Sequence, residues 1–382
     1  MYNVRKVTED IVWVGASDRR LALFENIFPI PRGVSYNSYV LLDEKTVLLD
    51  TVDASVAGQF FENLEHVLDG RKLDYLIVNH MEPDHCAMIG DLVRRYPEVQ
   101  VVGNTKTFGM IKQFFGTDFA ETVKEGDTLA TGAHTLHFVM APMVHWPEVM
   151  VTYDEKDKVL FAADGFGTFG ALNGNIFADE VDFDRDWLDD ARRYFINIVG
   201  KYGPSVQGLL KKASALDISV IAPLHGPVID KDFDFYIDKY MRWSSYQPEE
   251  KGTVIAYSTL HGNTRKAALK LGDDLKKLSD EPVVVYDLSR DDCAKAVADS
   301  FRFDKLVLAG VTYDGGLMPC MEDFIYHLKM KNYQNRKAAV IENGSWGPVA
   351  GKLMTDALAS FKNMNVCETK VTIKTRLNAK NE

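Results

Sequence analysis

The chain has 382 residues, of which 46% are hydrophobic and 26% are charged, and its formal net charge is −11. A chain of this length exceeds what one hydrophobic core usually organises, so we expect two domains. The acidic balance argues against nucleic acid as the main partner, because phosphate binding needs clustered Lys and Arg, and no run approaches the roughly 20 apolar residues of a membrane span.

The N-terminal residues and the cysteines predict a cytoplasmic protein. Residues 1–6 lead into charged residues rather than into an apolar segment, so they do not resemble a signal peptide. Cys86, Cys293, Cys320 and Cys367 lie far apart and form no Cys-x-x-Cys pair, which is typical of reduced, packed thiols.

The first domain is expected to cover residues 1–248. It opens with short strands and continues with strands that alternate with helix-like segments, an order that predicts two sheets sandwiched between helices. The strands are expected at residues 11–14, 35–42, 45–50, 75–79, 101–103, 136–140, 159–163 and 219–223, with a helical stretch at 183–215.

The second domain is expected to cover residues 252–382, after a polar segment at 244–252 that is typical of an interdomain linker. Its strands and helices alternate as a βαβ series, which predicts a parallel, doubly wound sheet of the α/β class. Because such a domain normally covers its last strand with another helix, we expect the natural chain to extend beyond Glu382. The strands are expected at 254–257, 283–286, 305–309, 338–342 and 368–375.

The segment His80-Met81-Glu82-Pro83-Asp84-His85 places four potential metal ligands in one loop after an expected strand. Loops on a rigid scaffold are where metal centres are usually built. Three more potential ligands stand at or just beyond the carboxyl ends of later strands, so all of them can meet at one rim. Seven ligands are too many for one ion and suit two ions that share a bridge. The candidate ligands are His80, Glu82, Asp84, His85, His145, Asp164 and His225.

Glu82 favours iron over zinc. It stands where zinc hydrolases with the pattern His-x-His-x-Asp-His have a histidine. With one bridging hydroxide, three carboxylates neutralise two divalent ions, and the additional hard anion favours a metal that can become trivalent. Zinc cannot do so, so we expect a non-haem diiron centre. A dinuclear zinc hydrolase with an appended flavodoxin-like module is the alternative.

Ordinary structural roles are expected for the other histidines and for Cys86. His134 and His137 are expected to be strand residues, and His66 and His327 helix residues. Cys86 is expected to be packed rather than reactive. Asp84 and His85 on their own would also suit the first turn of a helix, where Asp caps the free N–H groups.

Three loops of the second domain suit a flavin mononucleotide (FMN). They follow successive strands and share the edge of the sheet where ligands of such folds bind. Free N–H groups at the helix start after the first loop would hold a phosphate, although a plain turn and cap would also explain that loop alone. Tyr313 and Trp346 offer flat surfaces for the isoalloxazine ring. The candidate residues are Thr259, Leu260, His261, Gly262, Asn263 and Thr264, then Val311, Thr312, Tyr313, Asp314 and Gly315, then Asn343, Gly344, Ser345, Trp346 and Gly347.

Taken together, these motifs resemble those of the two-domain flavodiiron proteins, and the resemblance covers almost the whole chain. It implies a metallo-β-lactamase-like αββα sandwich followed by a flavodoxin-like doubly wound parallel sheet. The ligand order matches that of the family without a gap. The resemblance implies that one iron is held by His80, Glu82 and His145, the other by Asp84, His85 and His225, and that Asp164 bridges them.

The resemblance also implies an aromatic neighbour for the metals, Tyr194. Some members of the family place a histidine near the diiron pocket from an early loop. Here Leu23-Phe24-Glu25 occupies that region and no histidine precedes His66. An apolar pocket wall is therefore expected, and the preference between O₂ and NO stays open.

The resemblance implies an oxidoreductase that reduces O₂ to water, NO to N₂O, or both. Two ferrous ions and a reduced FMN supply the four electrons that convert O₂ to two waters, and the conversion of two NO to N₂O needs two. Because the sequence contains no Cys-x-x-Cys pair, we expect no rubredoxin-like extension and a separate donor: a rubredoxin, a reduced deazaflavin coenzyme or a reductase. A head-to-tail homodimer or a dimer of dimers is implied, with the FMN of one subunit beside the iron of the other. An electron-transfer flavoprotein with a vestigial metal domain is a further alternative.

Overall fold

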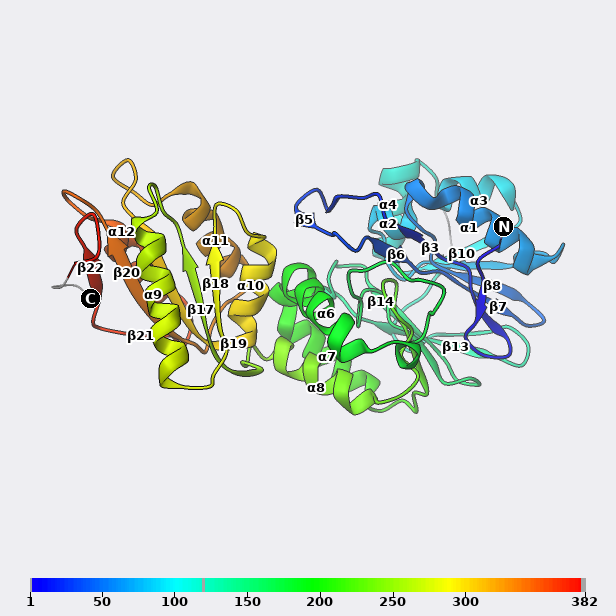
Figure 1. Cartoon of the computed structure of the whole chain (residues 1–382). Helices are drawn as coiled ribbons and strands as arrows, with labels where there is room; N and C mark the ends of the chain where they lie inside the picture. The colour runs from blue at the N-terminus through cyan, green and yellow to red at the C-terminus, as the bar shows by residue number, and fades with distance from the viewer. Residues whose placement is uncertain (1, 119–120, 379–382) are drawn as a thin grey trace. The chain divides into compact units, whose positions relative to one another are not determined.

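The computed structural model describes residues 2–118 and 121–378 of the chain (Figure 1). These residues form two compact units. The N-terminal unit runs to Phe195 and includes Pro204–Asp238, and the C-terminal unit consists of Ile196–Gly203 and the chain from Lys239 onward. The expected division into two domains, residues 1–248 and 252–382, stays a prediction.

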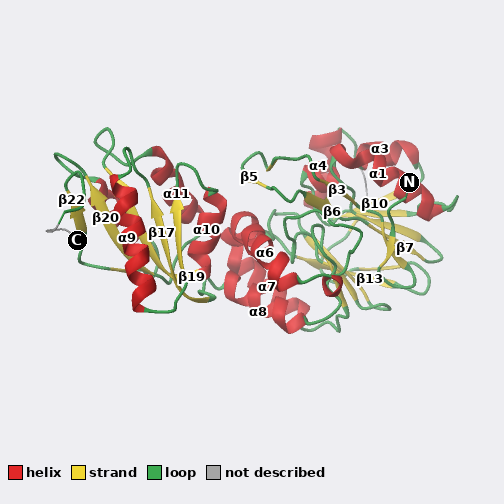
Figure 2. Cartoon of the chain, in the orientation of Figure 1, coloured by secondary structure: helices red, strands yellow, loops and turns green. Residues whose placement is uncertain are grey.

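The N-terminal unit contains two sheets with helices on their outer faces, so the predicted sandwich is confirmed (Figure 2). Residues such as Leu41, Leu48, Leu76, Phe138 and Leu160 are fully or almost fully buried in its core. In sheet order, the seven-stranded sheet consists of β1 (Arg5–Lys6), β2 (Ile11–Trp13), β7 (Tyr39–Leu42), β8 (Thr46–Leu49), β9 (Tyr75–Ile77), β10 (Gln100–Gly103) and β11 (Glu121–Thr122). The five-stranded sheet consists of β12 (Thr128–Ala130), β13 (Thr135–Met140), β14 (Met150–Asp154), β15 (Val159–Phe161) and β16 (Val220–Ala222).

Two small sheets and several helices complete the chain up to Ser244, of which Ile196–Gly203 and the residues from Lys239 onward belong to the C-terminal unit. Two small hairpin-like sheets pair β3 (Ala16–Asp18) with β6 (Val34–Tyr36) and β4 (Leu23–Phe24) with β5 (Phe28–Pro29). The α-helices are α1 (Ala57–Leu68), α2 (Pro83–Cys86), α3 (Ile89–Arg95), α4 (Thr105–Phe115), α5 (Phe183–Asp186), α6 (Leu188–Tyr194), α7 (Gly203–Ala213) and α8 (Phe233–Ser244). The predicted helix at 183–215 is therefore divided, and a π-helical turn at Phe195–Val199 and a 3₁₀ turn at Gly200–Tyr202 separate α6 from α7. Further 3₁₀ turns lie at Ala54–Val56 and Ala178–Glu180.

The single strand expected at residues 35–42 is wrong, because a buried asparagine divides it. The Asn37 side chain donates to Pro223 O at 2.9 Å and to Gly226 O at 2.8 Å, and it accepts from Trp13 Nε1 at 3.0 Å. These bonds turn the backbone between β6 and β7, which pair in different sheets. The same bonds tie this turn to the loop that carries His225.

The C-terminal unit is built on a parallel sheet, as the βαβ series predicts. Its order is β18-β17-β19-β20-β21, and β22 pairs with the carboxyl-terminal end of β20. The chain enters at β17, goes to β18 on one side and then to β19 on the other, so the order reverses at the carboxyl ends of β17 and β19. Ligands of doubly wound sheets bind at such a reversal. The strands are β17 (Glu250–Tyr257), β18 (Val283–Asp287), β19 (Phe303–Val311), β20 (Lys337–Asn343), β21 (Asn365–Val366) and β22 (Val371–Ile373), and the helices are α9 (Asn263–Leu278), α10 (Cys293–Arg302), α11 (Pro319–Met330) and α12 (Ala350–Ala359).

Two boundaries of this unit differ from the prediction. Residues 250–252, expected in the linker, begin β17, because Glu250 pairs with Phe303 in β19 and Gly252 N donates to Asp304 Oδ1 at 2.9 Å. The final strand expected at 368–375 is limited to β22, where Val371, Thr372 and Ile373 pair with β20.

Candidate metal centre and flavin pocket

Four strand ends of the N-terminal unit bring the seven candidate metal ligands together. The segment 80–85 follows β9, His145 lies between β13 and β14, Asp164 follows β15, and His225 follows β16. The helix after β9 begins at Pro83, so Asp84 and His85 belong to its first turn. Proline suits this position because it has no N–H to leave unsatisfied.

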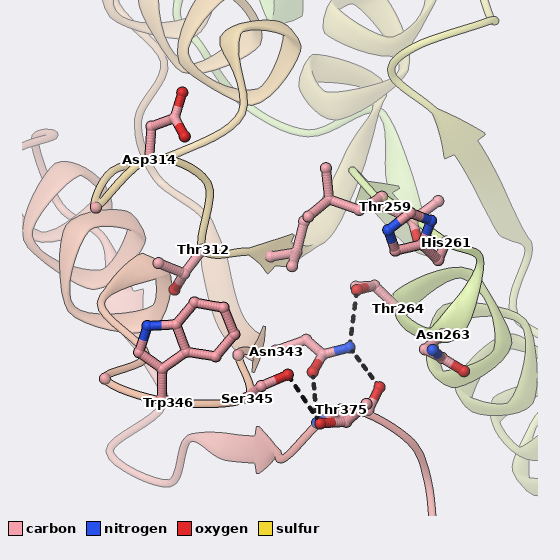
Figure 3. Close-up of a pocket in the computed structure, with 15 residues that line it drawn as sticks. Thr259, His261, Asn263, Thr264, Thr312, Asp314, Asn343, Ser345, Trp346 and Thr375 are labelled. Atoms are coloured by element: carbon pink, nitrogen blue, oxygen red, sulfur yellow. Dashed lines mark hydrogen bonds between the residues drawn. The ribbon is translucent and has the colours of Figure 1, made fainter.

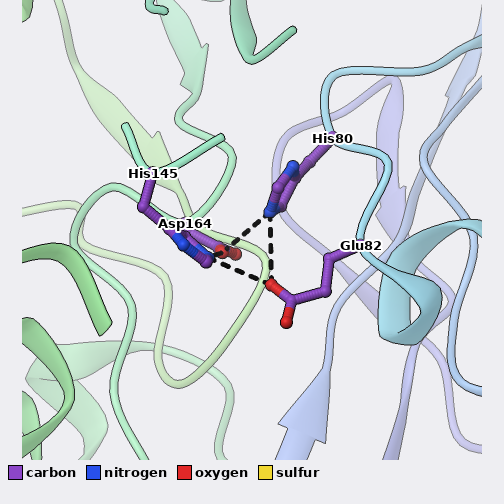
Figure 4. A group of neighbouring side chains, drawn as sticks. All are labelled: His80, Glu82, His145 and Asp164. Atoms are coloured by element: carbon purple, nitrogen blue, oxygen red, sulfur yellow. Dashed lines mark hydrogen bonds and ion pairs between the residues drawn. The ribbon is translucent and has the colours of Figure 1, made fainter. Parts of the chain in front are cut away.

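The first group consists of His80, Glu82, His145 and Asp164, all buried, with ligand atoms within 4.8 Å of one another. His145 Nε2 lies 3.0 Å from Glu82 Oε2 and 3.1 Å from Asp164 Oδ2. His80 Nε2 lies 3.4 Å and 3.2 Å from the same two oxygens. Figure 4 shows the four side chains pointing at one common space from separate parts of the chain. Buried ligand atoms that converge in this way are able to hold a metal ion.

The second group consists of Asp84, His85 and His225, also buried. The Nε2 atoms of His85 and His225 are 3.1 Å apart, and Asp84 oxygens lie 3.5 Å and 3.3 Å from them. Asp164 Oδ1 faces this group at 3.2 Å from His85 Nε2, while Asp164 Oδ2 faces the first group. Asp164 can therefore serve both groups with its two oxygens.

Several ligand atoms are buried without a hydrogen bond. They are His80 Nε2 and both carboxylate oxygens of Asp84 and Asp164. A buried polar atom in this state costs free energy unless another partner is present, and two cations would be that partner. Because the Asp84 oxygens make no hydrogen bond, this residue does not cap the helix, and the helix-cap interpretation of the motif is not supported.

The electrostatics of the first group also suit a cation. Burial alone would raise the pKa of Asp164, but the facing rings of His80 and His145 hold it well below its ordinary value. Burial opposes the charged form of His145, yet Asp164 and Glu82 outweigh it and raise the pKa of this imidazole to about 9. A cluster that stabilises positive charge on its histidines attracts metal cations for the same reason.

Two contacts that sequence reasoning missed orient the histidines. His225 Nδ1 donates to Ser35 O at 2.7 Å. His80 Nδ1 lies 2.8 Å from Glu148 Oε1, which also accepts from Met81 N at 2.8 Å. Each contact holds the proton on Nδ1 and leaves the Nε2 lone pair for a metal. The only sequence signal for Glu148 is its place three residues after His145.

Aromatic side chains cover the His225 side of the two candidate ligand groups. The Tyr194 ring, expected near the metals, has its centroid 5.4 Å from the His225 ring. Phe24 packs edge-on to His225 at 5.5 Å and to Phe169 at 5.4 Å, and it is only 3% exposed. Of the expected apolar wall at residues 23–25, Phe24 is the buried part, whereas Leu23 is 37% exposed.

The other histidines have ordinary contacts, although His134, expected in a strand, lies just before β13. His134 is buried with Nδ1 3.0 Å from Asp154, and Asp10 and Lys156 approach its Nε2. The group of Asp10, His134 and Asp157 resembles a metal site by proximity alone, but the ammonium of Lys156 already supplies its cation. His66 stacks on Tyr2.

The three predicted flavin loops line one cavity of about 370 Å³ in the C-terminal unit (Figure 3). A volume of this order is typical of cofactor sites. All predicted flavin-loop residues except Gly262 and Tyr313 line it, and Thr375 lines it in addition. Gly262 has a left-handed backbone with φ 82° before α9. Tyr313 lies in a tight turn in which Gly316 N donates to Tyr313 O at 2.7 Å.

Asn343 connects the parts of this pocket. Its Nδ2 donates to Thr264 Oγ1 at 3.3 Å and to Thr375 O at 3.2 Å, and its Oδ1 accepts from Thr375 N at 3.1 Å. Trp346 does not pack under its loop, because 87% of it is exposed. An indole this exposed beside a polar cavity is a surface on which a flat ring can stack.

Within the described ranges of both units, no helix has the length and apolar character needed to cross a membrane.

Comparison with known proteins identifies a family and relatives of similar sequence. The family model described as "ODP family beta lactamase" matches residues 34–226. The "Nitric oxide reductase" of Moorella thermoacetica is 31% identical over 376 residues, which cover 96% of this chain and 92% of that protein. The "Anaerobic nitric oxide reductase flavorubredoxin" of Pectobacterium atrosepticum is 30% identical over 376 residues, which cover 95% of this chain and 73% of that protein.

Among solved structures, the rubredoxin oxygen:oxidoreductase of Desulfovibrio gigas superposes with a TM-score of 0.93. The match covers 99% of this chain and 94% of that chain at 24% sequence identity. This likeness shows that the two chains share one fold along their length.

Proposed function

This chain belongs to the flavodiiron protein family, and from that premise we propose that it reduces nitric oxide, dioxygen or both at a pair of iron ions, with electrons that arrive through FMN. The observation that carries the proposal is the pair of buried ligand groups that face each other across Asp164. The sequence relatives are named for nitric oxide reduction and the structural neighbour for oxygen reduction, so both gases are kept as substrates.

The proposed metal ligands divide as the two groups do. One ion would be held by His80, Glu82 and His145, the other by Asp84, His85 and His225, with Asp164 shared. When bound, the irons supply two electrons and open coordination positions for the gas. The protein holds the imidazoles in the required tautomer through Glu148 and Ser35 O, and Phe24 and Tyr194 keep water away from the His225 side.

FMN is proposed for the cavity of the C-terminal unit. When bound, it supplies two further electrons, which with the irons match the four that O₂ reduction to water consumes. The start of α9 after Thr259–Gly262 offers free N–H groups to a phosphate. Trp346 offers its exposed ring to the isoalloxazine. Thr375 extends the proposed site beyond the three loops.

We predict that Asn343→Ala weakens FMN binding about tenfold, because the loops lose hydrogen bonds that hold them at one spacing. Fluorescence titration of the flavin-free protein with FMN measures the dissociation constant. Asn365→Ala, at an exposed residue of β21, is the control and should bind FMN normally. Equal affinity of both variants would contradict the proposed role of Asn343.

A head-to-tail homodimer, or a dimer of dimers, is also proposed, with a separate rubredoxin, reduced deazaflavin coenzyme or reductase as the donor. Two residues that line the flavin cavity are apolar and exposed, Leu260 at 45% and Trp346 at 87%, and they support an interface there. Sedimentation that finds only a fully active monomer would contradict the dimer. The four free cysteines support the proposed cytoplasmic location, which fractionation of the source cells tests.

The proposed function is tested by anaerobic reduction of the iron- and FMN-loaded protein, followed by separate exposure to O₂ and to NO. We expect rapid reoxidation of iron and flavin, with water as the product from O₂ or N₂O as the product from NO. Absorbance follows the reoxidation, and gas analysis identifies the product.

The control is FMN-loaded protein without metal, because reduced flavin reacts with O₂ by itself and gives hydrogen peroxide. Reoxidation no faster than in this control, with either gas, would contradict the proposal. Two zinc ions per chain in the protein as isolated would favour the zinc hydrolase instead.

A further inference from the structure

Glu148 is a buried carboxylate outside the proposed ligand set. It is 1% exposed and lies in the same loop as His145. Its Oε1 is 2.8 Å from His80 Nδ1 and accepts a hydrogen bond from Met81 N at 2.8 Å. Its Oε2 is buried without a hydrogen bond. One carboxylate thus connects the loop of His145 to the loop that carries His80 and Glu82.

The contact with His80 has a chemical consequence. A carboxylate beside Nδ1 accepts a hydrogen bond from the Nδ1–H group, so the proton stays on Nδ1 and the imidazole keeps its Nε2 lone pair free. That Nε2 points at the first ligand group, 3.2 Å from Asp164 Oδ2 and 3.4 Å from Glu82 Oε2. A carboxylate on the outer nitrogen also makes an imidazole a stronger donor to a metal.

A purely structural role does not account for Glu148. Backbone bonds already hold its loop, since Met150 N donates to Asn79 O at 3.1 Å and Ala141 N to Val149 O at 2.9 Å. Within the described residues, the ion pair recorded for Glu148 is with His80, and no Lys or Arg is paired with it. A buried carboxylate is costly unless positive charge lies close by. The first ligand group, once it holds a cation, supplies that charge through His80.

We propose that Glu148 is a positioning residue of the first iron: it fixes the tautomer of His80, strengthens the His80–metal bond and stabilises the more highly charged state of that ion. This inference rests on the diiron centre of the proposed function. It adds a fourth carboxylate to the three of the ligand set, and its charge reaches the metal through His80 instead of by direct coordination.

Glu148→Gln is the most informative variant, because glutamine keeps the size and one acceptor oxygen but removes the charge. Glu148→Ala removes the contact altogether. Glu155→Gln is the matched control: this glutamate also faces a histidine, His137 Nε2 at 3.0 Å, but its side chain is 66% exposed and it lies outside both ligand groups. Circular dichroism confirms that each variant is folded.

Two quantities are measured. The first is the iron content at equilibrium with increasing concentrations of a chelator. The second is the set of reduction potentials of the iron centre, monitored by electron paramagnetic resonance. Removal of an outer carboxylate typically weakens metal binding by roughly 10- to 100-fold. We therefore expect Glu148→Ala to lose one of its two irons at a chelator concentration roughly 10- to 100-fold lower than the wild type does. Glu148→Gln should show a smaller loss and a higher reduction potential of one iron, because the ferric state is less stabilised.

The inference would be overturned if both Glu148 variants had the same iron affinity and reduction potentials as the wild type and Glu155→Gln. That result would leave the proposed function intact, because the wild type would still hold two irons. A wild-type protein that binds no iron would contradict the proposed function itself, and the role of Glu148 with it.

Discussion

Asp164→Asn is expected to remove iron from both positions and to lower the rate of gas reduction by a factor on the order of 10³. Asparagine has nearly the same shape, so the effect isolates the charge. Asp164 is fully buried, and its two oxygens face different groups, at 3.2 Å from His80 Nε2 and 3.2 Å from His85 Nε2. An amide offers one weak neutral oxygen in place of two anionic ones, so neither ion keeps its shared ligand.

The measurements are metal content per chain and turnover with each gas. Asp154→Asn is the control, since Asp154 is equally buried and lies 3.0 Å from the Nδ1 of His134. This control should lose stability but keep both irons and its activity. If Asp164→Asn kept two irons and at least a tenth of the turnover, the bridging role would be contradicted.

The convergence of the seven candidate metal ligands could be predicted from the sequence because their chemistry is rare and their positions repeat. A histidine or aspartate directly after an apolar strand, as with Asp164 and His225, stands at a sheet edge whatever the exact strand bounds are. An error of two residues in a boundary therefore does not move the site. The same reasoning placed the flavin loops at one edge of the parallel sheet, where they line one cavity.

The features that the sequence did not predict depend on contacts between distant segments. Strand β14 is buried at all five residues and so has no alternation of apolar and polar side chains. Asn37 interrupts an apolar run through bonds to Pro223 and Gly226, far along the chain. In the sequence Glu148 resembles a surface glutamate. It is buried because folding brings the loop after β9 beside it. Local patterns contain none of this information.

Glu82→His is expected to change the metal rather than to empty the site. The replacement creates the His-x-His-x-Asp-His pattern of zinc hydrolases within this fold. Glu82 Oε2 lies 3.0 Å from His145 Nε2 and 3.4 Å from His80 Nε2, so it belongs to the first group. With histidine there, two divalent ions and a bridging hydroxide leave one uncompensated positive charge. A trivalent state is then disfavoured, and we expect at least about 100-fold slower gas reduction.

The measurement is the ratio of iron to zinc in protein produced with both metals present, together with turnover after loading with iron alone. Glu98→His is the control, because the Glu98 side chain is 75% exposed and pairs only with Lys72 among the ion pairs of the described residues. It should keep the wild-type ratio and rate. A Glu82→His variant that holds iron and reduces gas like this control would show that the charge of Glu82 does not select the metal.

The two parts of this experiment separate affinity from redox chemistry. If the variant takes up zinc but regains full turnover when loaded with iron alone, Glu82 sets only which metal is bound. If the iron-loaded variant stays slow, the charge of Glu82 acts on the ferric state, as the charge balance requires. Burial strengthens this argument, because Glu82 is only 8% exposed and Asp164 is fully buried. Little water is available to screen one unit of charge at such a site. The loss of the Glu82 charge therefore changes the electrostatic energy of both ions.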